Sequence, residues 1–469
     1  MAASLFDKLW EGHVVDHLGD GMDLIRIDRH LIHDLSGPAS LKMLSERGLS
    51  PRAPELTFAT PDHRVSTEPG RTGGGSPAND KALAVLRRYC DRYGIQLFDL
   101  NDAEQGIVHV VGPELGLTLP GLSLVCGDSH TCTHGAFGAL AWGIGNTEVT
   151  QVLAAQALIV ERPGSMRVSF EGELGPSVSA KDLILHLIGR EGAAGGARHA
   201  VEFAGEAVTG LSMEERMALC NLAVEFGASF GLIAPDETAF AFLEGRRFAP
   251  KGELWEAALQ SWRRLPSDPD ARFDAEIRID ASTVAPQVTW GVSPEDVVAI
   301  DGRVPDPAAA EGEKQAEARR HALDYMGLEP GAPIEGTPIQ HAFIGSCANA
   351  RFGDLAAAAE VVRGRKVADG VRAWVVPGSQ AVKRAAEAAG LDQVFRAAGF
   401  SWREPGCSMC LAANGETVPS GERAVSTSNR NFVGRQGPGA RTHLASPVTA
   451  AASAIAGRLT DPRRLGAGG

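Results

Sequence analysis

The sequence predicts an α/β fold in which helices cover layers of strands. Apolar runs suited to buried strands recur, for example at residues 122–125, 341–345 and 371–376, and each leads through a polar loop towards a helical pattern. This repeated order of strand, loop and helix is typical of layered α/β domains. The 55 glycines and 27 prolines predict many turns, which suits a functional site built from loops.

The length supports more than one domain. A chain of 469 residues, 44% of them hydrophobic, can bury the cores of about two to four domains. We predict three, with boundaries at residues 1–163, 164–284 and 285–469.

The first segment is predicted to open with a helix over residues 4–15 and to reach an extended run at residues 58–63. Residues 70–75 include three consecutive glycines, which indicates a flexible loop. The next helix is expected over residues 79–93, where apolar side chains recur at helical spacing. Cys90 lies on that apolar face and is expected in the core.

Two further runs, residues 106–110 and 122–130, are predicted to be apolar strands that end in polar side chains. Ligands collect at the carboxyl ends of strands in open α/β sheets. His109, Asp128 and His130 are expected there.

A helix over residues 147–161 is predicted to close the first segment, before Arg162-Pro163-Gly164. Cys126 and Cys132 each stand alone, and lone cysteines are more often packed than metal-bound. Both are expected to be structural.

The second segment is predicted to begin with a strand over residues 166–173. Helices are expected at residues 179–192 and 212–226, because each range opens with a serine-led capping box and ends before or at a glycine. Cys220 lies inside the second of these helices and reads as core. Residues 245–284 are polar and helical in pattern and are expected to form a surface connector.

The third segment is predicted to alternate strands and helices. Strands are expected at residues 341–345, 371–376 and 423–426, and helices at residues 354–362, 380–389 and 447–457.

Composition excludes several classes of function. The net charge of -13 argues against a nucleic-acid surface, which relies on clustered Lys and Arg. The N-terminal stretch lacks the basic-then-apolar pattern of an export signal. No run approaches the roughly 20 apolar residues of a membrane span. We therefore expect a cytoplasmic protein with no nucleic-acid or membrane partner.

Three of the seven cysteines stand out. Cys407 and Cys410 form a C-x-x-C pair in a tight turn, and Cys347 follows a predicted strand. Three thiolates can hold an iron-sulfur cube and leave one iron without a protein ligand. The same spacing occurs in structural zinc sites, usually with four ligands, and in redox pairs. The spacing alone leaves these alternatives open.

The residues around these cysteines resemble a family. Residues 345–349, 405–411 and 426–435 read Gly-Ser-Cys-Ala-Asn, Pro-Gly-Cys-Ser-Met-Cys-Leu and Ser-Thr-Ser-Asn-Arg-Asn-Phe-Val-Gly-Arg. Three long motifs in this order are similar to those of the aconitase superfamily and, within it, of the isopropylmalate isomerase branch. The resemblance extends over nearly the whole chain. The resemblance implies three α/β/α layered domains around a central iron-sulfur cleft.

The resemblance also implies an activity: a hydro-lyase that isomerises 2-isopropylmalate to 3-isopropylmalate by dehydration and rehydration, for leucine biosynthesis. It implies a 4Fe-4S cluster held by Cys347, Cys407 and Cys410, with one open iron as Lewis acid.

The resemblance further implies that imidazoles pair with carboxylates. A neighbouring carboxylate favours the protonated imidazole ring, which is the form that an acid catalyst needs. The pairs are Asp62 with His63, His109 with Asp128, and His130 with Glu202. Asp62-His63 is expected to protonate the leaving hydroxyl, and the other pairs to orient the substrate and the iron-bound water.

Polar residues of the last motif are expected to hold the substrate. Arg430 and Arg435 are predicted to bind its carboxylates, since guanidinium matches a carboxylate in bidentate geometry. Asn349 and Asn429 are expected at the rim of the cluster.

A catalytic base is missing from this set. The family uses a serine from a further, swivelling domain, and the residues after Pro447 are too few to form one. The resemblance therefore implies a heterodimer with a small subunit that carries the base.

Two departures from the family pattern bear on the substrate. Ala348 and Ala350 replace hydroxyl residues beside Cys347, and the stretch at residues 70–77 also differs. The same chemistry on another 2-substituted malate or on homoaconitate is the alternative. Two other classes of function are disfavoured. The acidic net charge argues against an iron-sensing RNA-binding protein. A ferredoxin-like electron carrier would normally have four cysteine ligands.

Overall fold

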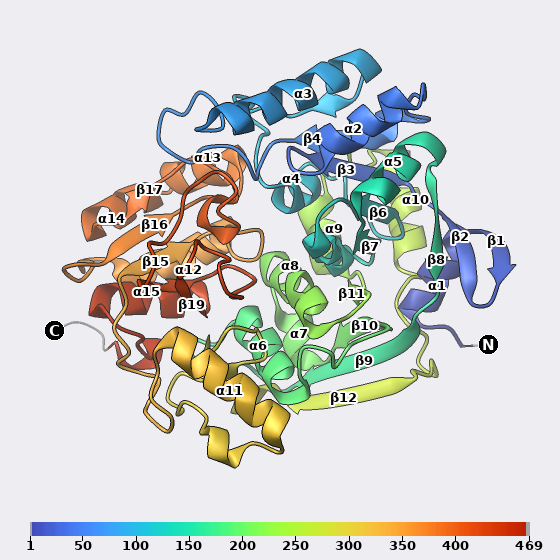
Figure 1. Cartoon of the computed structure of the whole chain (residues 1–469). Helices are drawn as coiled ribbons and strands as arrows, with labels where there is room; N and C mark the ends of the chain where they lie inside the picture. The colour runs from blue at the N-terminus through green and yellow to red at the C-terminus, as the bar shows by residue number, and fades with distance from the viewer. Residues whose placement is uncertain (1, 466–469) are drawn as a thin grey trace. The chain divides into compact units, whose positions relative to one another are not determined.

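The computed structural model describes residues 2–465 (Figure 1). Contacts divide the chain into two compact units. Unit 1 contains the chain up to Ser66 together with Thr72–Gly172 and Gly196–Asp280. Unit 2 contains Thr67–Arg71, Glu173–Gly195 and the chain from Ala281 onward. The predicted three-domain division is a different partition and stays a prediction.

Unit 1 contains a five-stranded parallel sheet of order β5-β4-β3-β6-β7. Its strands are β3 (Arg29–His33), β4 (Thr57–Thr60), β5 (Gln96–Leu97), β6 (Ser123–Cys126) and β7 (Leu140–Gly143). Its helices are α2 (Gly37–Glu46), α3 (Pro77–Tyr93), α4 (Val108–Glu114) and α5 (Asn146–Ala155). Helices α2 and α3 pack against each other (Figure 1).

A second parallel sheet in unit 1 has the order β11-β10-β9-β12. Its strands are β9 (Gly164–Glu171), β10 (His199–Ala204), β11 (Phe230–Leu232) and β12 (Ala275–Asp280), and the helices between them are α7 (Glu206–Gly210), α8 (Met213–Asn221), α9 (Glu237–Leu243) and α10 (Glu253–Trp262). A small antiparallel sheet joins β1 (Val14–Gly19), β2 (Met22–Arg26) and β8 (Ala157–Glu161).

The N-terminal helix α1 (Leu5–His13) packs into the core of unit 1. Ser4 and Asp7 form its capping box, which satisfies backbone N–H groups in the first turn. Leu5, Leu9 and Trp10 are fully or almost fully buried in that core.

Unit 2 is built on a five-stranded parallel sheet of order β17-β16-β15-β18-β19. Its strands are β15 (His341–Ile344), β16 (Arg372–Val375), β17 (Ser401–Trp402), β18 (Arg423–Ser426) and β19 (Arg441–Leu444). Its helices are α6 (Ala180–Glu191), α11 (Glu313–Met326), α12 (Phe352–Val362), α13 (Gln380–Ala388), α14 (Leu391–Ala398) and α15 (Pro447–Ala456), and β13 (Gln287–Thr289) pairs with β14 (Val297–Ala299).

The observed layers confirm the predicted α/β class, but some predicted elements were wrong. Residues 106–110 do not form a strand: they lead into α4, whose residues from Val108 to Pro113 are buried. A short apolar run shows neither the 3.6-residue spacing of a helix nor the alternation of a strand, so its pattern does not distinguish the two. The helix predicted at 147–161 ends at Ala155, because Gln156 is left-handed and β8 follows.

The predicted connector at residues 245–284 is more than a surface appendage. It contains α10 and the strand β12, which pairs with β9 at the edge of the second sheet. Polar residues alternate along β12, and one face of an edge strand can remain in water. The prediction also missed α14 and β19.

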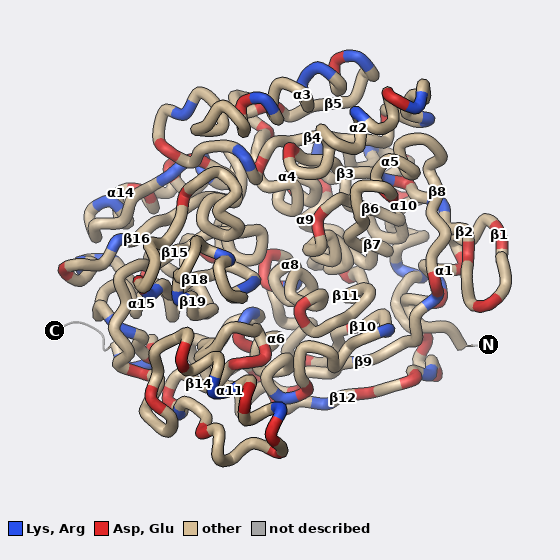
Figure 2. Tube along the Cα trace, in the orientation of Figure 1, with Lys and Arg blue, Asp and Glu red and all other residues tan. Residues whose placement is uncertain are grey.

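Charged residues of both signs are mixed along the exposed helices. Figure 2 shows Lys and Arg interspersed with Asp and Glu on α3 and α11. Within residues 2–465, no helix combines the length and the apolar character needed to cross a membrane.

Candidate active site

Unit 1 gathers polar residues at the carboxyl ends of three adjacent strands. Asp34 directly follows β3, Asp62 and His63 follow β4, and Asp128 and His130 follow β6. The carboxyl ends of parallel strands meet at one edge of a sheet, so residues far apart in sequence become neighbours.

Asp128 is the centre of this group. Its carboxylate lies 3.3 Å from His63 Nε2, 3.3 Å from His109 Nε2 and 3.4 Å from His130 Nδ1. The predicted contact between His109 and Asp128 is therefore present, although His109 reaches it from α4 rather than from a strand. His134 supports His109 from behind, with 3.0 Å between their ring nitrogens.

The predicted pair of Asp62 and His63 is also present. Asp62 Oδ1 lies 2.6 Å from His63 Nδ1, and Asp62 Oδ2 accepts the backbone N–H of Val108 at the start of α4. Asp34 accepts the backbone N–H groups of Asp62, His63 and Arg64. Two buried carboxylates thus fix the ring and backbone of His63.

The predicted partner of His130 was wrong. His130 Nε2 lies 2.9 Å from Glu225 Oε1, whereas Glu202 on β10 accepts hydrogen bonds from Arg167 and Ser267. The carboxylate of Glu202 therefore pairs with residues of its own sheet and the segment before β12, and not with His130. Glu225 lies in a single 3-10 turn, Leu222–Phe226, that follows α8. No signal in the sequence singled it out.

The loop that carries His130 is held close to β11. A Cβ atom at Gly135 would lie 1.8 Å from the carbonyl oxygen of Gly231, so only glycine permits this approach. The close contact fixes the turn between Asp128 and Gly138 against the second sheet.

Electrostatics in this group favour charged forms. Burial raises the pKa of Asp128, but hydrogen bonds from His109, His130 and His63 outweigh it and hold that pKa well below its usual value. Burial lowers the pKa of His130, but Asp128 and Glu225 outweigh it and the pKa is raised. His33, beside His63, has a pKa lowered by burial to about 4 and is neutral at pH 7.

Unit 2 gathers the three predicted cysteine ligands in the same way. Cys347 follows β15, Cys407 and Cys410 follow β17, and Asn429 follows β18. The three cysteines are 7%, 6% and 5% exposed. One side-chain amide joins two of them, since Asn429 Nδ2 lies 3.3 Å from Cys347 Sγ and Asn429 Oδ1 lies 3.3 Å from Cys410 Sγ.

The backbone beside the cysteines takes unusual conformations. Ser346 and Ser408 have φ angles of 77° and 49°, in the left-handed region that non-glycine residues rarely adopt. Ser346 Oγ contacts Cys410 Sγ at 3.3 Å, and Ser408 donates to Glu416. Such strained residues cluster at functional sites, where the surrounding contacts hold them.

The other four cysteines belong to unit 1. Cys90, Cys126, Cys132 and Cys220 are all buried in unit 1. Burial raises the pKa of Cys90 to about 12 and those of Cys126 and Cys220 well above their usual value. Their burial agrees with the predicted structural role, and within its described residues unit 2 contains three cysteines, Cys347, Cys407 and Cys410. This donor set fits an iron-sulfur cube with one open iron.

The predicted substrate residues lie in the same loops of unit 2. Arg435 is partly exposed and packs against the ring of Phe432, and in the described chain it forms no ion pair. Asn349 donates to Asp354, while its Oδ1 atom is buried without a hydrogen-bond partner in the structure. Arg430 is partly exposed next to Asn429.

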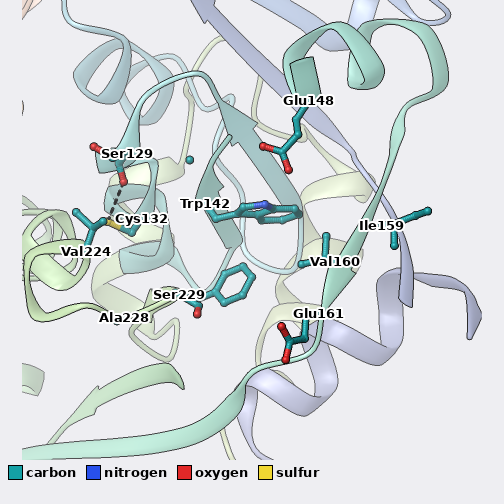
Figure 3. A pocket seen from close by; sticks show the side chains of 12 residues that line it. Ser129, Cys132, Trp142, Glu148, Ile159, Val160, Glu161, Val224, Ala228 and Ser229 are labelled. Atoms are coloured by element: carbon teal, nitrogen blue, oxygen red, sulfur yellow. Dashed lines mark hydrogen bonds between the residues drawn. The ribbon is translucent and has the colours of Figure 1, made fainter. Parts of the chain in front are cut away.

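A further cavity lies within unit 1. It has a volume of about 440 Å³, and Figure 3 shows Trp142 in it with Glu148 and Glu161 on opposite sides of the ring. Ser129 and Val224, which line it, precede His130 and Glu225 in sequence. None of the predicted site residues lines this cavity.

Sequence comparisons with known proteins agree with the motifs. Residues 7–457 match the model of the aconitase family (aconitate hydratase). The chain is 59% identical to the 3-isopropylmalate dehydratase large subunit 1 of Bradyrhizobium diazoefficiens over 98% of this chain and 97% of that protein. Among solved structures, Thermococcus kodakaraensis aconitase X (holo-form) matches with a TM-score of 0.46 and 14% identity, over 87% of this chain and 84% of that one. With a family model that spans nearly the whole sequence, the chain belongs to the aconitase family.

Proposed function

We propose that this chain is the large catalytic subunit of a hydro-lyase that isomerises 2-isopropylmalate to 3-isopropylmalate in leucine biosynthesis. The observation that carries the proposal is the 59% identity, over 98% of the chain, to a protein named as such a large subunit. The two groups of polar residues supply most of the parts that dehydration and rehydration need.

Cys347, Cys407 and Cys410 are the residues that would hold a 4Fe-4S cluster. When bound, such a cluster supplies a Lewis-acidic iron that weakens the bond between carbon and the leaving hydroxyl. The support for this assignment is the three-thiolate donor set, with Asn429 between two of its sulfurs.

His63 is the proposed acid that protonates the leaving hydroxyl. It lies between two carboxylates, with Asp62 at Nδ1 and Asp128 at Nε2. Both anions favour the protonated ring. His109 and His130, held by Asp128 and Glu225, are proposed to orient the substrate and the water that departs and returns.

Arg430 and Arg435 are proposed to bind the substrate carboxylates, because a guanidinium with no carboxylate partner of its own, as at Arg435, can form a bidentate pair. The buried, unpartnered Oδ1 of Asn349 is suited to accept a hydrogen bond from a substrate hydroxyl.

A small subunit is the proposed partner. The words "large subunit" in the name of the Bradyrhizobium relative imply a second chain. We propose that this partner carries a swivelling domain, the serine base that removes the carbon-bound proton, and most of the pocket for the substrate side chain.

The test is anaerobic co-expression with the small-subunit gene, reconstitution with iron and sulfide, and assay of 2-alkylmalates by the absorbance of the unsaturated intermediate. We expect turnover of 2-isopropylmalate by the pair and none by this chain alone. Cys407→Ala should abolish turnover, whereas Cys90→Ala, in the core of unit 1, should retain it. Full activity of the isolated chain would refute the two-subunit proposal.

A second candidate substrate follows from the cysteine loop. Ala348 and Ala350 are both fully buried, and the family resemblance implies hydroxyl residues at these two positions. Another 2-substituted malate, or homoaconitate, is therefore the alternative, and a higher kcat/KM for that compound in the same panel would favour it.

A further inference from the structure

Lys181 is a fully buried cation that the proposed chemistry does not use. It lies in the first turn of α6, within unit 2, and its side chain is 0% exposed. Burial of an ammonium group is costly unless the group is paired, and the N-terminus of a helix disfavours a positive charge. Burial and the helix N-terminus both disfavour the charged form of Lys181, so its ammonium group needs a compensating interaction.

The compensating contacts lead to the cysteines. Lys181 Nζ donates to the backbone carbonyls of Thr427 and Ser428, at 2.5 and 2.7 Å. The next residue is Asn429, whose amide lies 3.3 Å from the sulfurs of both Cys347 and Cys410. Lys181 thus fixes the backbone from which the bridging amide projects.

The surroundings of Lys181 are anionic. Burial lowers its pKa to about 7, and the Cys410, Asp354, Asp182 and Cys347 side chains oppose that change. Asp354 also caps α12 and accepts a hydrogen bond from Asn349. With this pKa the amine is partly protonated at neutral pH, and its ammonium form lies within electrostatic reach of two of the three proposed ligands.

We propose that Lys181 is a positioning residue for the cysteine group. Its ammonium holds the carbonyls of Thr427 and Ser428 so that Asn429 keeps Cys347 and Cys410 in place. It also supplies a buried positive charge that offsets the thiolates. This inference rests on the proposed cofactor, but its readouts do not depend on which substrate the enzyme uses.

The experiment compares Lys181→Met, which removes both the charge and the donors, with Lys181→Arg, which retains a charge and donors. Each chain is reconstituted anaerobically with iron and sulfide. The first readout is the rate of iron loss to a chelator, and the second is the midpoint reduction potential of the cluster by electron paramagnetic resonance. Loss of an outer partner of a metal ligand typically weakens binding by about 10- to 100-fold.

We expect Lys181→Met to lose iron about 10- to 100-fold faster than the parent chain. Its reduction potential should fall, because a nearby positive charge favours the electron-richer state. Lys181→Arg should show a smaller change in both readouts. A role confined to packing would leave the potential unchanged.

Lys8 provides the matched control. Its Nζ also donates to two backbone carbonyls, those of Arg264 and Pro266, but it lies in unit 1, which contains none of the three cysteines. Lys8→Met should leave iron retention and reduction potential unchanged. Circular dichroism and thermal unfolding of the apo chains identify variants that fail to fold. If Lys181→Met fails to fold, the comparison of Lys181→Arg with the parent and with Lys8→Met decides.

Three results would overturn the proposal: iron retention and potential in a folded Lys181→Met chain equal to those of the parent, equal losses in Lys181→Met and Lys8→Met, or a parent chain that binds no cluster. If Lys181→Met does not fold, Lys181→Arg decides: a change in potential or iron retention that Lys8→Met does not show supports the proposal, and values equal to those of the parent overturn it. A parent chain that holds the cluster but turns over no 2-alkylmalate refutes only the proposed function.

Discussion

Asp128 shows how one residue can organise a site. Three imidazoles lie 3.3 to 3.4 Å from its carboxylate, and each is braced on its far side: His63 by Asp62, His109 by His134, and His130 by Glu225. A single buried anion therefore sets the orientation of three rings. The rings in turn keep the anion ionised, because their hydrogen bonds hold its pKa low.

The reassignment of the His130 partner gives the first prediction. Glu225→Gln keeps a hydrogen-bond acceptor but removes the charge that favours protonated His130, so kcat should fall about 10- to 100-fold. Glu202→Gln is the matched control, and it should leave kcat unchanged and cost about 1 kcal/mol of stability at most. Steady-state kinetics of the two-subunit enzyme measure both. A loss of kcat in the Glu202 variant alone would restore the original pairing.

The same pair predicts a pH dependence of stability. The folded-state pKa of His130 is raised above its ordinary value of 6.5. The stability from its charged hydrogen bonds is therefore fully present below pH 6.5 and is lost as pH rises through the folded-state pKa. The difference in unfolding free energy between the parent and Glu225→Gln should be larger at about pH 6 than at about pH 9. Urea unfolding at both values tests this, and a constant difference would contradict it.

At the scale of elements, the cysteine turn depends on a short neighbouring segment. Thr67–Arg71 belongs to unit 2, where Glu416 accepts hydrogen bonds from the backbone and hydroxyl of Thr67 and from Ser408. Arg403 joins the same network and stacks 3.7 Å from the ring of Trp374. These contacts hold the left-handed Ser408 between Cys407 and Cys410.

Glu416 and Glu68 offer a matched test of this network, since both pair with Arg403. Glu416→Ala should cost about 3 kcal/mol of unfolding free energy, because it removes the partly buried carboxylate that pairs with Arg403 and accepts hydrogen bonds from the hydroxyls of Thr67 and Ser408. Glu68 is 64% exposed, and Glu68→Ala should cost less than about 1 kcal/mol. Denaturant unfolding of the apo chain gives both values. Equal losses would show that the network does not support the turn.

At the scale of the whole molecule, the two units place different side chains on similar parallel sheets. Each has a parallel sheet with its polar residues after the carboxyl ends of the strands. Unit 1 supplies imidazoles and carboxylates, and unit 2 supplies thiols, amides and guanidinium groups. A bound cluster should therefore stabilise one unit directly.

Hydrogen exchange measures that difference. Cluster binding to folded chain stabilises the segments that ligate it. Amides at residues 344–350, 405–411 and 426–431 should exchange more slowly in the reconstituted chain than in the apo chain. The core of unit 1 around β6 and α5 serves as the internal reference and should change little. Equal exchange in both states at the three segments would contradict the ligand assignment.

Much of the fold and site could be predicted from local patterns. The capping boxes at Ser179 and Ser212 marked helix starts correctly, because a capping side chain binds N–H groups two or three residues away. The errors came where tertiary contacts decide. The run at residues 106–110 became helical where Asp62 accepts the N–H of Val108, and β12 became a strand by pairing with β9.

By itself, the sequence determined the Asp62-His63 pair and the family, and it predicted the cysteine ligands, because each depends on residues that are close in the chain or on motifs of fixed sequence. Only the tertiary structure decided that Glu225 rather than Glu202 faces His130 and that Lys181 lies behind Asn429. These partners are separated by 95 residues in the first case and by more than 240 in the second. Such pairings arise from the packing of distant segments, which no local pattern encodes.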